Sequence, residues 1–245
     1  MKFENIKVFN FENALRGMRN PKNSWNQSDS YFGLEFNDFE NILLRTHDQD
    51  FIILNEDNDC VEFASIGPKD MKLALALIKG GSEHRKFLRQ IFVTVDITAP
   101  LYWWKEFDTY KVGTVANSTS TMHKLAETPI TLDCFEIDDY DKDFGDNDFI
   151  VELIDYLEHL RQKYLETQDK RYWKELIRWL PESWMQTRTV TMNYENLLAM
   201  CSKGQRRFHK LTEWSGTDEI KPSFIQFARS LPYAQEFIFI DELED

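Results

Sequence analysis

The amino-acid sequence predicts an α+β fold in which strands dominate the first half and helices with one returning strand dominate the second. In residues 91–97, Ile and Val occupy every second position, which is the pattern of a strand with one buried face. In residues 149–166, apolar residues recur every three or four positions and line one face of a helix. The run TRTVTM at 187–192 is rich in β-branched residues and predicts a further strand.

The first half opens with short apolar runs at 51–54 and 60–65, and the NEDND sequence between them predicts a hairpin turn. Pro68 precedes the helical pattern MKLALALIK, which a pair of glycines ends. After the alternating strand, Pro100 predicts the start of another helix, LYWWKEFDTYK, because proline is tolerated in the first helical turn. The two tryptophans of this helix are adjacent, so we expect one to face the core and the other to pack elsewhere.

The second half continues the helical pattern of 149–166 with the sequence RYWKELIRWL, which Pro181 ends. After the strand at 187–192, Asn193 is a suitable N-cap for a helix that begins at the next residue. Two further helices are predicted, near 205–214 and 222–230.

The composition excludes several classes of protein. The chain has 245 residues, and its 42 acidic and 29 basic side chains give a net charge of -13, which disfavours binding to duplex nucleic acid. No apolar run reaches the roughly 18 residues of a membrane span, and the first residues lack the apolar centre of a signal peptide. The three cysteines are widely spaced and lack metal-ligating neighbours, so we expect a reducing compartment and no metal site. We therefore expect a cytoplasmic globular protein without membrane contact.

The strongest local change in composition is the acidic segment 131–148, which we interpret as a surface loop of a single domain spanning 1–245. Its aspartates resemble a calcium loop, but Gly145 is not followed by a glutamate six residues later, so the EF-hand spacing fails.

Three stretches are candidates for a ligand site. Residues 80–90 place a glycine turn before several cations, which suits a phosphate or an anionic cofactor but equally a solvated basic turn. Residues 103–124 end in a run rich in hydroxyl groups, which fits a nucleotide loop or an ordinary connector. Residues 180–214 hold the densest cationic cluster, in which Arg206 and Lys210 share a helical face if the predicted helix forms. His209 is four residues from a glutamate there, which also fits a purely structural pair.

Taken in order, these stretches resemble the flavin-dependent thymidylate synthase family over about residues 70–215. The family has a His-x-Ser/Thr-Pro-x-Glu-His turn before a strand, and residues 84–90 occupy that place. The family's next helix begins at an Ala-Pro step, matched at 99–100, and ends in Arg-His-Arg, where 109–111 read Thr-Tyr-Lys. Thr119 follows at the spacing of the family's serine. The later matches are Leu180-Pro181, the strand 187–192, Asn193, and His209 with Glu213.

The resemblance implies a central, mostly antiparallel sheet flanked by helices, FAD as the cofactor, dUMP as the nucleotide, and a homotetramer with flavin at subunit junctions. The residues that it assigns to cofactor binding are His84, Lys86, Arg89, Lys111, Asn193 and His209. The residues that it assigns to the substrate are Thr119, Arg188, Arg206 and Arg207. It assigns no catalytic residue and no metal ligand.

The chain departs from the family's motif at the cations. Only Lys111 keeps a charge in the Arg-His-Arg position, and Thr121 stands where the family has the arginine that holds the deoxyuridylate phosphate. Each lost charged hydrogen bond removes about 1.5–3 kcal/mol. The cations available as replacements are Lys86, Arg89, Lys111, Lys124 and Arg188.

These observations favour a divergent thymidylate synthase-like protein that binds a nucleotide or flavin and has lost the family's cations for deoxyuridylate. Residues 11–25 resemble phage proteins, so we expect a phage or prophage origin. One alternative is a non-enzymatic phage interaction module on the same scaffold, with the pocket closed or re-lined. Another is a protein that sequesters a nucleotide with the cations of 203–210. The sequence leaves open whether the protein is an enzyme. A Tyr110 side chain that filled the flavin site would argue against an enzyme.

Overall fold

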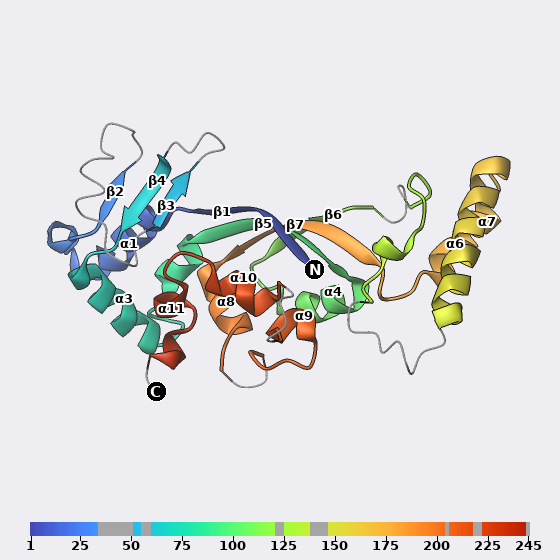
Figure 1. The fold of residues 1–245 in the computed structure, drawn as a ribbon. Coiled ribbons are helices and arrows are strands. Elements are labelled where there is room, and N and C mark those ends of the chain that lie inside the picture. Colours follow the sequence, from blue (N-terminus) through green and yellow to red (C-terminus); the bar gives the residue numbers. More distant parts are fainter. Residues whose placement is uncertain are drawn as a thin grey trace. The chain divides into compact units, whose positions relative to one another are not determined.

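The computed structural model describes residues 1–33, 51–54, 60–120, 125–137, 147–203, 206–217 and 222–243. The chain forms two compact units. The first unit consists of Met1–Glu4, Asp96–Tyr110 and Ala116–Val190, and the second of Asn5–Val95, Lys111–Val115 and Thr191–Asp245. The chain combines antiparallel strand pairs with helices that mostly gather in its second half (Figure 1), which confirms the predicted α+β class. The assignment of the whole chain to one domain stays a prediction.

The larger sheet has four strands in the order β1-β5-β7-β6. Strand β5 (Phe92–Pro100) is the predicted alternating strand, and its Val93, Val95 and Ile97 are fully buried, as is Ile91 just before it. Strand β7 (Met185–Asn193) extends the predicted 187–192 strand. Three pairs of side chains link the strands at 2.5–3.3 Å: Thr94 with Thr191, Asp96 with Thr189, and Thr98 with Thr187. The numbers rise along one strand as they fall along the other, so β5 and β7 are antiparallel.

The smaller sheet has three strands in the order β2-β4-β3 and lies in the second unit. Strands β3 (Phe51–Leu54) and β4 (Cys60–Ser65) pair antiparallel, which confirms the predicted hairpin, although its turn lies outside the described residues. Strand β2 (Tyr31–Gly33) pairs antiparallel with the other side of β4 and was not predicted. Three residues are too few to show a period in the sequence.

The N-terminal elements were also missed. Strand β1 (Lys2–Phe9) is an edge strand of the larger sheet. Val8 is its one buried residue, so the strand has no alternation of buried apolar and exposed polar residues that the sequence could reveal. Helix α1 (Phe11–Arg19) buries Phe11, Ala14, Leu15 and Met18. That spacing is a regular helical pattern, so a search for periodicity beginning at the first residue would have found α1.

The remaining helices of the second unit surround buried aromatic residues. Helix α3 (Pro68–Lys79) begins at the predicted proline and ends at Gly80. Helices α8 (Tyr194–Met200), α10 (Phe224–Arg229) and α11 (Ala234–Phe237) follow β7. The Phe237 ring stacks on Phe11 at 6.4 Å and meets Phe87 edge-on at 5.8 Å, which ties the end of the chain to α1.

The predicted helix over 205–214 is wrong. In the described part of this stretch, residues 206–208 form turns and the helix α9 is confined to Thr212–Ser215. The reason is Arg207, which is buried and bonds to groups outside this stretch, so the chain follows that side chain instead of a helical path. The same-face pairing of Arg206 with Lys210 is therefore also wrong.

The first unit contains helix α4 (Leu101–Phe107), strand β6 (Val115–Ser118) in part, and the antiparallel pair α6 (Asn147–Thr167) and α7 (Lys170–Trp179), drawn in yellow in Figure 1. Trp103 and Trp104 of α4 are both fully buried and meet edge-on at 5.0 Å, so the expectation that only one faces the core is wrong. Within the described ranges, no helix has the length and apolarity needed to cross a membrane.

Helices α6 and α7 pack on the start of the segment that was predicted to be an acidic loop. Leu157, Leu160 and Leu176 share an apolar core with Phe135, so residues 131–137 carry a buried anchor. Residues 138–146 lie outside the described residues, and the loop interpretation of that part stays a prediction. Glu158 of α6 fixes the preceding chain, because its carboxylate accepts the Ile130 N–H at 2.8 Å.

Glu158 gives the first unit an acid-sensitive contact. Hydrogen bonds from the Arg161 side chain, assisted by those from the Ile130 N–H and Gln162, lower the pKa of Glu158 from 4.5 to about 2. The ionised carboxylate therefore stabilises the fold fully above pH 4.5, and this stabilisation is lost as the pH falls toward 2. We expect Glu158→Gln to cost about 2 kcal/mol at neutral pH and to remove this part of the acid sensitivity, as measured by urea unfolding from neutral to acidic pH.

The control for this substitution is Glu166→Gln, which removes an exposed carboxylate that pairs with Lys163 on the same helix. We expect a change below about 0.5 kcal/mol for the control. Equal acid sensitivity of the wild-type protein and Glu158→Gln would contradict the assignment.

Candidate functional site

Parts of all three candidate stretches meet at the start of helix α8. The predicted N-cap at Asn193 is confirmed: its side chain accepts the Asn196 N–H at 3.0 Å, and the Asn196 side chain accepts the Asn193 N–H at 3.0 Å. This reciprocal pair fixes both amide side chains and the direction in which the helix leaves β7. The Tyr194 N–H donates to the Ile91 carbonyl at 3.0 Å and holds the helix start on the strand-entry segment.

Two arginines of the first stretch converge on one carboxylate of α8. Arg85 Nε donates to Glu195 at 3.1 Å, and Arg89 Nε donates to its other oxygen at 2.9 Å. A short 3-10 helix, Lys86–Gln90, sets the spacing that brings both guanidinium groups to the same acid. Glu195 therefore neutralises one of the two charges and leaves a net positive pair, in which the Arg89 side chain is 49% exposed.

The second stretch contributes a tight turn at 111–114. The Thr114 N–H donates to the Lys111 carbonyl at 2.9 Å, and the Val112 carbonyl accepts from Asn196 Nδ2 at 2.7 Å. Gly113 has φ of 85°, a left-handed backbone angle that favours glycine, whereas a Cβ there would make only an ordinary contact with Asn196 Nδ2 at 3.4 Å. Lys111 is exposed and forms no ion pair with the described residues.

The cluster formed by Arg85, Arg89, Lys111, Asn193, Glu195 and Asn196 is hereafter called the α8 site. It combines two arginines and one carboxylate with fixed amide groups and a glycine turn that begins at the exposed Lys111. This balance favours a small anion, such as a diphosphate, over a cation. Glu195 would compete with that anion for both arginines.

His84 and Lys86 are adjacent to the α8 site in sequence but make other contacts. His84 lines a largely apolar pocket of about 310 Å³ with Leu73, Leu77 and Gly80. Lys86 lies 3.8 Å from Glu83, and both side chains are well exposed.

Thr119 and Arg188 lie in the first unit. The Thr119 N–H donates to the Thr187 carbonyl at 2.9 Å, which places it at the edge of β7. Arg188 is held between an acid and an aromatic ring: Nη1 lies 3.3 Å from Asp108, and the guanidinium carbon lies 4.2 Å from the centre of the Trp104 ring. Its side chain is only 17% exposed. Thr121 and Lys124 fall outside the described residues.

Tyr110 lies in the first unit as well. Its hydroxyl donates to Glu106 at 2.8 Å, one turn earlier in the chain. The side chain is half-buried.

Arg206, Arg207 and His209 lie beyond the other end of α8. Arg206 Nη1 donates to the Ala199 carbonyl at 2.7 Å, which closes the C-terminus of the helix. Arg207 Nη2 donates to Asp241 at 2.6 Å, and Nη1 donates to Glu242 at 2.9 Å. His209 Nδ1 accepts the Leu211 N–H at 3.0 Å. Their assignments to substrate and cofactor stay predictions.

Sequence reasoning missed a buried ionic lock between α1 and α3. Arg19 Nε donates to the fully buried Asp70, which also accepts the Ser28 and Ser30 hydroxyls at 2.6 Å each. Burial alone would raise the pKa of Asp70, but the hydrogen bonds from Ser28, Ser30 and Arg19 outweigh it and hold that pKa below 3.8. The partners are about 40–50 residues apart, so helical or strand periodicity carries no signal for them.

The lock is reciprocal, because Asp29 returns the same type of contact. Its carboxylate accepts the N–H groups of Lys69 and Asp70 at 2.9 and 3.1 Å and so caps α3. Asp70 in turn accepts the N–H groups of Asp29 and Ser30, both at 3.2 Å. Gly67 lets the two segments touch, since a Cβ there would lie 2.4 Å from Asp29.

Comparison with known proteins places the fold. No protein-family model matches the chain, and no curated protein sequence matches it. A crystal structure of flavin-dependent thymidylate synthase ThyX from Helicobacter pylori, complexed with FAD and dUMP, is similar with a TM-score of 0.57 and 15% identity, covering 98% of this chain and 99% of that one. A second structure of the Helicobacter pylori enzyme with FAD and dUMP has a TM-score of 0.54 and 14% identity, covering 98% and 97% of the two chains. The resemblance predicted from the motifs is therefore confirmed for the fold, over nearly the whole chain.

Proposed function

We propose that this chain is a divergent thymidylate synthase-like protein that binds FAD or a related nucleotide at the α8 site and does not methylate deoxyuridylate. The observation that carries the proposal is the convergence of the three motif stretches on α8, in a fold whose similar structures are complexed with FAD and dUMP. Arg89 and Lys111 would hold the diphosphate, while Asn193 and Asn196 would fix the turn beside it. A bound flavin would supply hydride-transfer chemistry.

The fit to deoxyuridylate is poor by comparison. Thr121 cannot supply the guanidinium that the resemblance expects, and Arg188 is already engaged by Asp108 and the Trp104 ring. Arg207 is buried against two carboxylates. Recruiting either arginine to a phosphate would break its present ion pairs, which costs free energy that a single new contact does not restore.

The direct test is the visible absorption spectrum of the purified protein before and after incubation with excess FAD and desalting. We expect a retained flavin band and no conversion of dUMP to dTMP when a reductant and methylene-tetrahydrofolate are added. A folded protein that stays colourless would overturn flavin binding, and dTMP production would overturn the loss of methylation.

Glu195→Gln tests whether the α8 site is where the cofactor binds. Removing the carboxylate frees Arg85 and Arg89 from their shared ion pair, so we expect FAD to bind about three- to tenfold more tightly at low salt. Fluorescence titration of FAD measures this. Glu83→Gln is the matched control, because it makes the same change of charge at an exposed pair outside the site. An equal effect of both substitutions would indicate a general electrostatic effect and not a local site.

A second candidate function is a non-enzymatic interaction module. Val112 lies in the turn of the α8 site and Val115 follows it, and their apolar side chains are 86% and 65% exposed, which suits a contact with another protein. A folded protein that cannot be loaded with FAD and shows no binding of nucleotides at low or high salt would favour this function. The sequestering alternative requires nucleotide binding without flavin, which weakens as salt rises.

The proposal includes the oligomeric state and location that the sequence predicts. We propose a homo-oligomer, a tetramer by resemblance, of a phage-encoded protein in the cytoplasm of its host. Sedimentation of the FAD-loaded protein tests the first part.

A further inference from the structure

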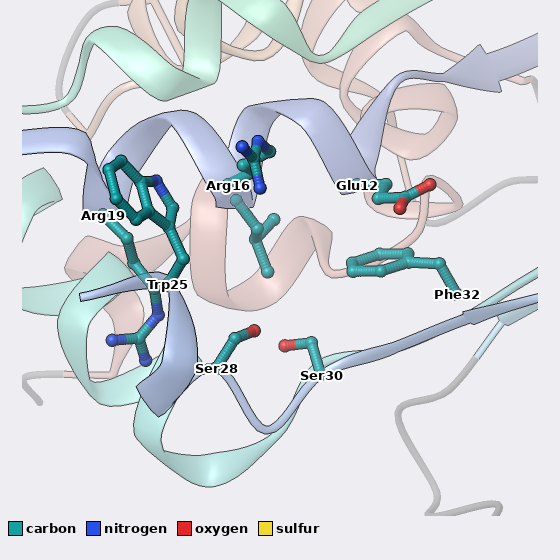
Figure 2. A pocket seen from close by; sticks show the side chains of 8 residues that line it. Glu12, Arg16, Arg19, Trp25, Ser28, Ser30 and Phe32 are labelled. Carbon is teal, nitrogen blue, oxygen red and sulfur yellow. The ribbon is translucent and has the colours of Figure 1, made fainter. Parts of the chain in front are cut away.

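A pocket of about 190 Å³ lies beside helix α1 and shares no residue with the α8 site. Figure 2 shows its lining: Glu12 and Arg16 come from α1, while Trp25, Ser28, Ser30 and Phe32 come from the segment after it. All these residues belong to the second unit. None of them was singled out by the sequence as a site residue.

The ends of the pocket are aromatic. Trp25 and Phe32 lie on opposite sides of it in Figure 2, with the two serines between them. Trp25 is 41% exposed, yet its ring is held in place because Nε1 donates to Asn20 at 2.8 Å. An exposed tryptophan with a fixed ring is a stacking surface that loses little entropy when a flat ligand covers it.

The pocket has a cation at its mouth. Arg16 is exposed, and its guanidinium carbon lies 5.6 Å from the centre of the Trp25 ring. It forms no ion pair with the residues that the structure describes, and in this it differs from Arg19, Arg85, Arg188 and Arg207. In a chain with a net charge of -13, an arginine left beside an aromatic ring is available to an anionic group.

The polar groups between the aromatic ends are already oriented. The Ser28 and Ser30 hydroxyls both donate to Asp70 at 2.6 Å, so their hydrogens point away from an incoming ligand. Ser30 Oγ also accepts the Gly67 N–H at 3.1 Å. Ser28 Oγ therefore presents lone pairs that accept, and cannot donate, a further hydrogen bond. The matching ligand group is an N–H.

We propose that this pocket binds a nucleoside monophosphate. The base would lie between Trp25 and Phe32, an N–H of the base would donate to Ser28 Oγ, and the phosphate would bind Arg16 at the mouth. The pocket volume fits a ligand of which only the base is enclosed, because 190 Å³ is below the roughly 300–1,000 Å³ of sites that enclose a whole drug-sized ligand. The base enters, and the sugar and phosphate stay near the surface.

The test is isothermal titration of the full-length protein with AMP, CMP, GMP and UMP at low salt, beside adenosine and inorganic phosphate. We expect at least one monophosphate to bind with a Kd in the micromolar to low millimolar range. Its affinity should be at least about tenfold higher than the affinity of adenosine or of inorganic phosphate. Arg16→Gln should weaken that monophosphate at least about tenfold and leave adenosine unchanged. Lys7→Gln, the same charge change at an exposed position outside the pocket, should change it less than twofold.

Trp25→Leu removes the stacking surface and should weaken both the monophosphate and adenosine about tenfold. If that variant does not fold, Trp25→Phe serves, with a smaller loss expected. The proposal is overturned if none of the four monophosphates binds with a Kd of about 5 mM or tighter, or if Arg16→Gln and Lys7→Gln bind equally well. Repeating the titration with Glu195→Gln separates the two sites, because a monophosphate bound at the α8 site would respond to that substitution and one bound beside α1 would not.

Discussion

Asp70→Asn is expected to lower the free energy of unfolding by about 3–5 kcal/mol, because it leaves Arg19 buried without its counterion. The amide also presents hydrogens to the Ser28 and Ser30 hydroxyls, which now donate to the carboxylate at 2.6 Å. Both hydroxyls would have to turn away, and the contact between residues 28–30 and α3 would weaken. Urea unfolding followed by circular dichroism measures the loss.

Glu83→Gln is the control for this substitution too, since its pair with Lys86 is exposed and should contribute less than about 1 kcal/mol. The pKa of Asp70 lies below its ordinary 3.8, so its contribution is complete above pH 3.8 and is lost as the pH falls through the lower native value. A loss of stability in Asp70→Asn no larger than in Glu83→Gln would contradict the buried lock.

Arg207→Leu is expected to destabilise the protein by about 3 kcal/mol and to release the C-terminal residues. The guanidinium joins the end of α8 to the C-terminus: Nε donates to the Cys201 carbonyl at 2.9 Å, while the other nitrogens donate to Asp241 and Glu242. Phe239 lies beneath it, with its ring centre 5.1 Å from the guanidinium carbon. Without this cation Asp241 loses its ion pair, and Glu242 keeps only its pair with the more exposed Arg229. Urea unfolding and limited proteolysis of the C-terminus follow the effect.

Lys210→Gln removes an exposed charge three residues away and should change stability by less than about 0.5 kcal/mol. The comparison also bears on the sequence-based assignment of Arg207 to the substrate. A variant that loses nucleotide binding while keeping full stability would support that assignment and contradict the structural role derived from these contacts.

The sequence predicted best those elements whose pattern depends on neighbours along the chain. The alternation over 91–97 predicted β5, the apolar stripe over 149–166 predicted α6, and Asn193 was placed correctly as a helix cap. Each depends on a local period or a local hydrogen bond. The helix over 205–214 failed because its local pattern competes with the distant partners of Arg207.

The site could be predicted only in part for the same reason. Motif order marked three stretches, and all three supply residues to the α8 site, whose role in binding stays a prediction. The pairing of Arg85 and Arg89 with Glu195 spans more than 100 residues and could not be inferred from composition or spacing. The pocket beside α1 depends on Ser28 and Ser30 being oriented by Asp70, which is again a contact distant in sequence.

The reciprocal contacts between Asp29 and Asp70 have a consequence for how this scaffold can change. They fasten residues 28–30 to residues 67–70, so the chain leaves and re-enters this part of the second unit at almost one point. A change in the length of the segment between those two attachments therefore changes the entropic cost of closing the loop only slightly. The segment that carries β2, β3 and β4 is thus a suitable position for new termini or an inserted domain. The hydrogen bonds of Asp29 and Asp70 would hold the two ends of that segment in place.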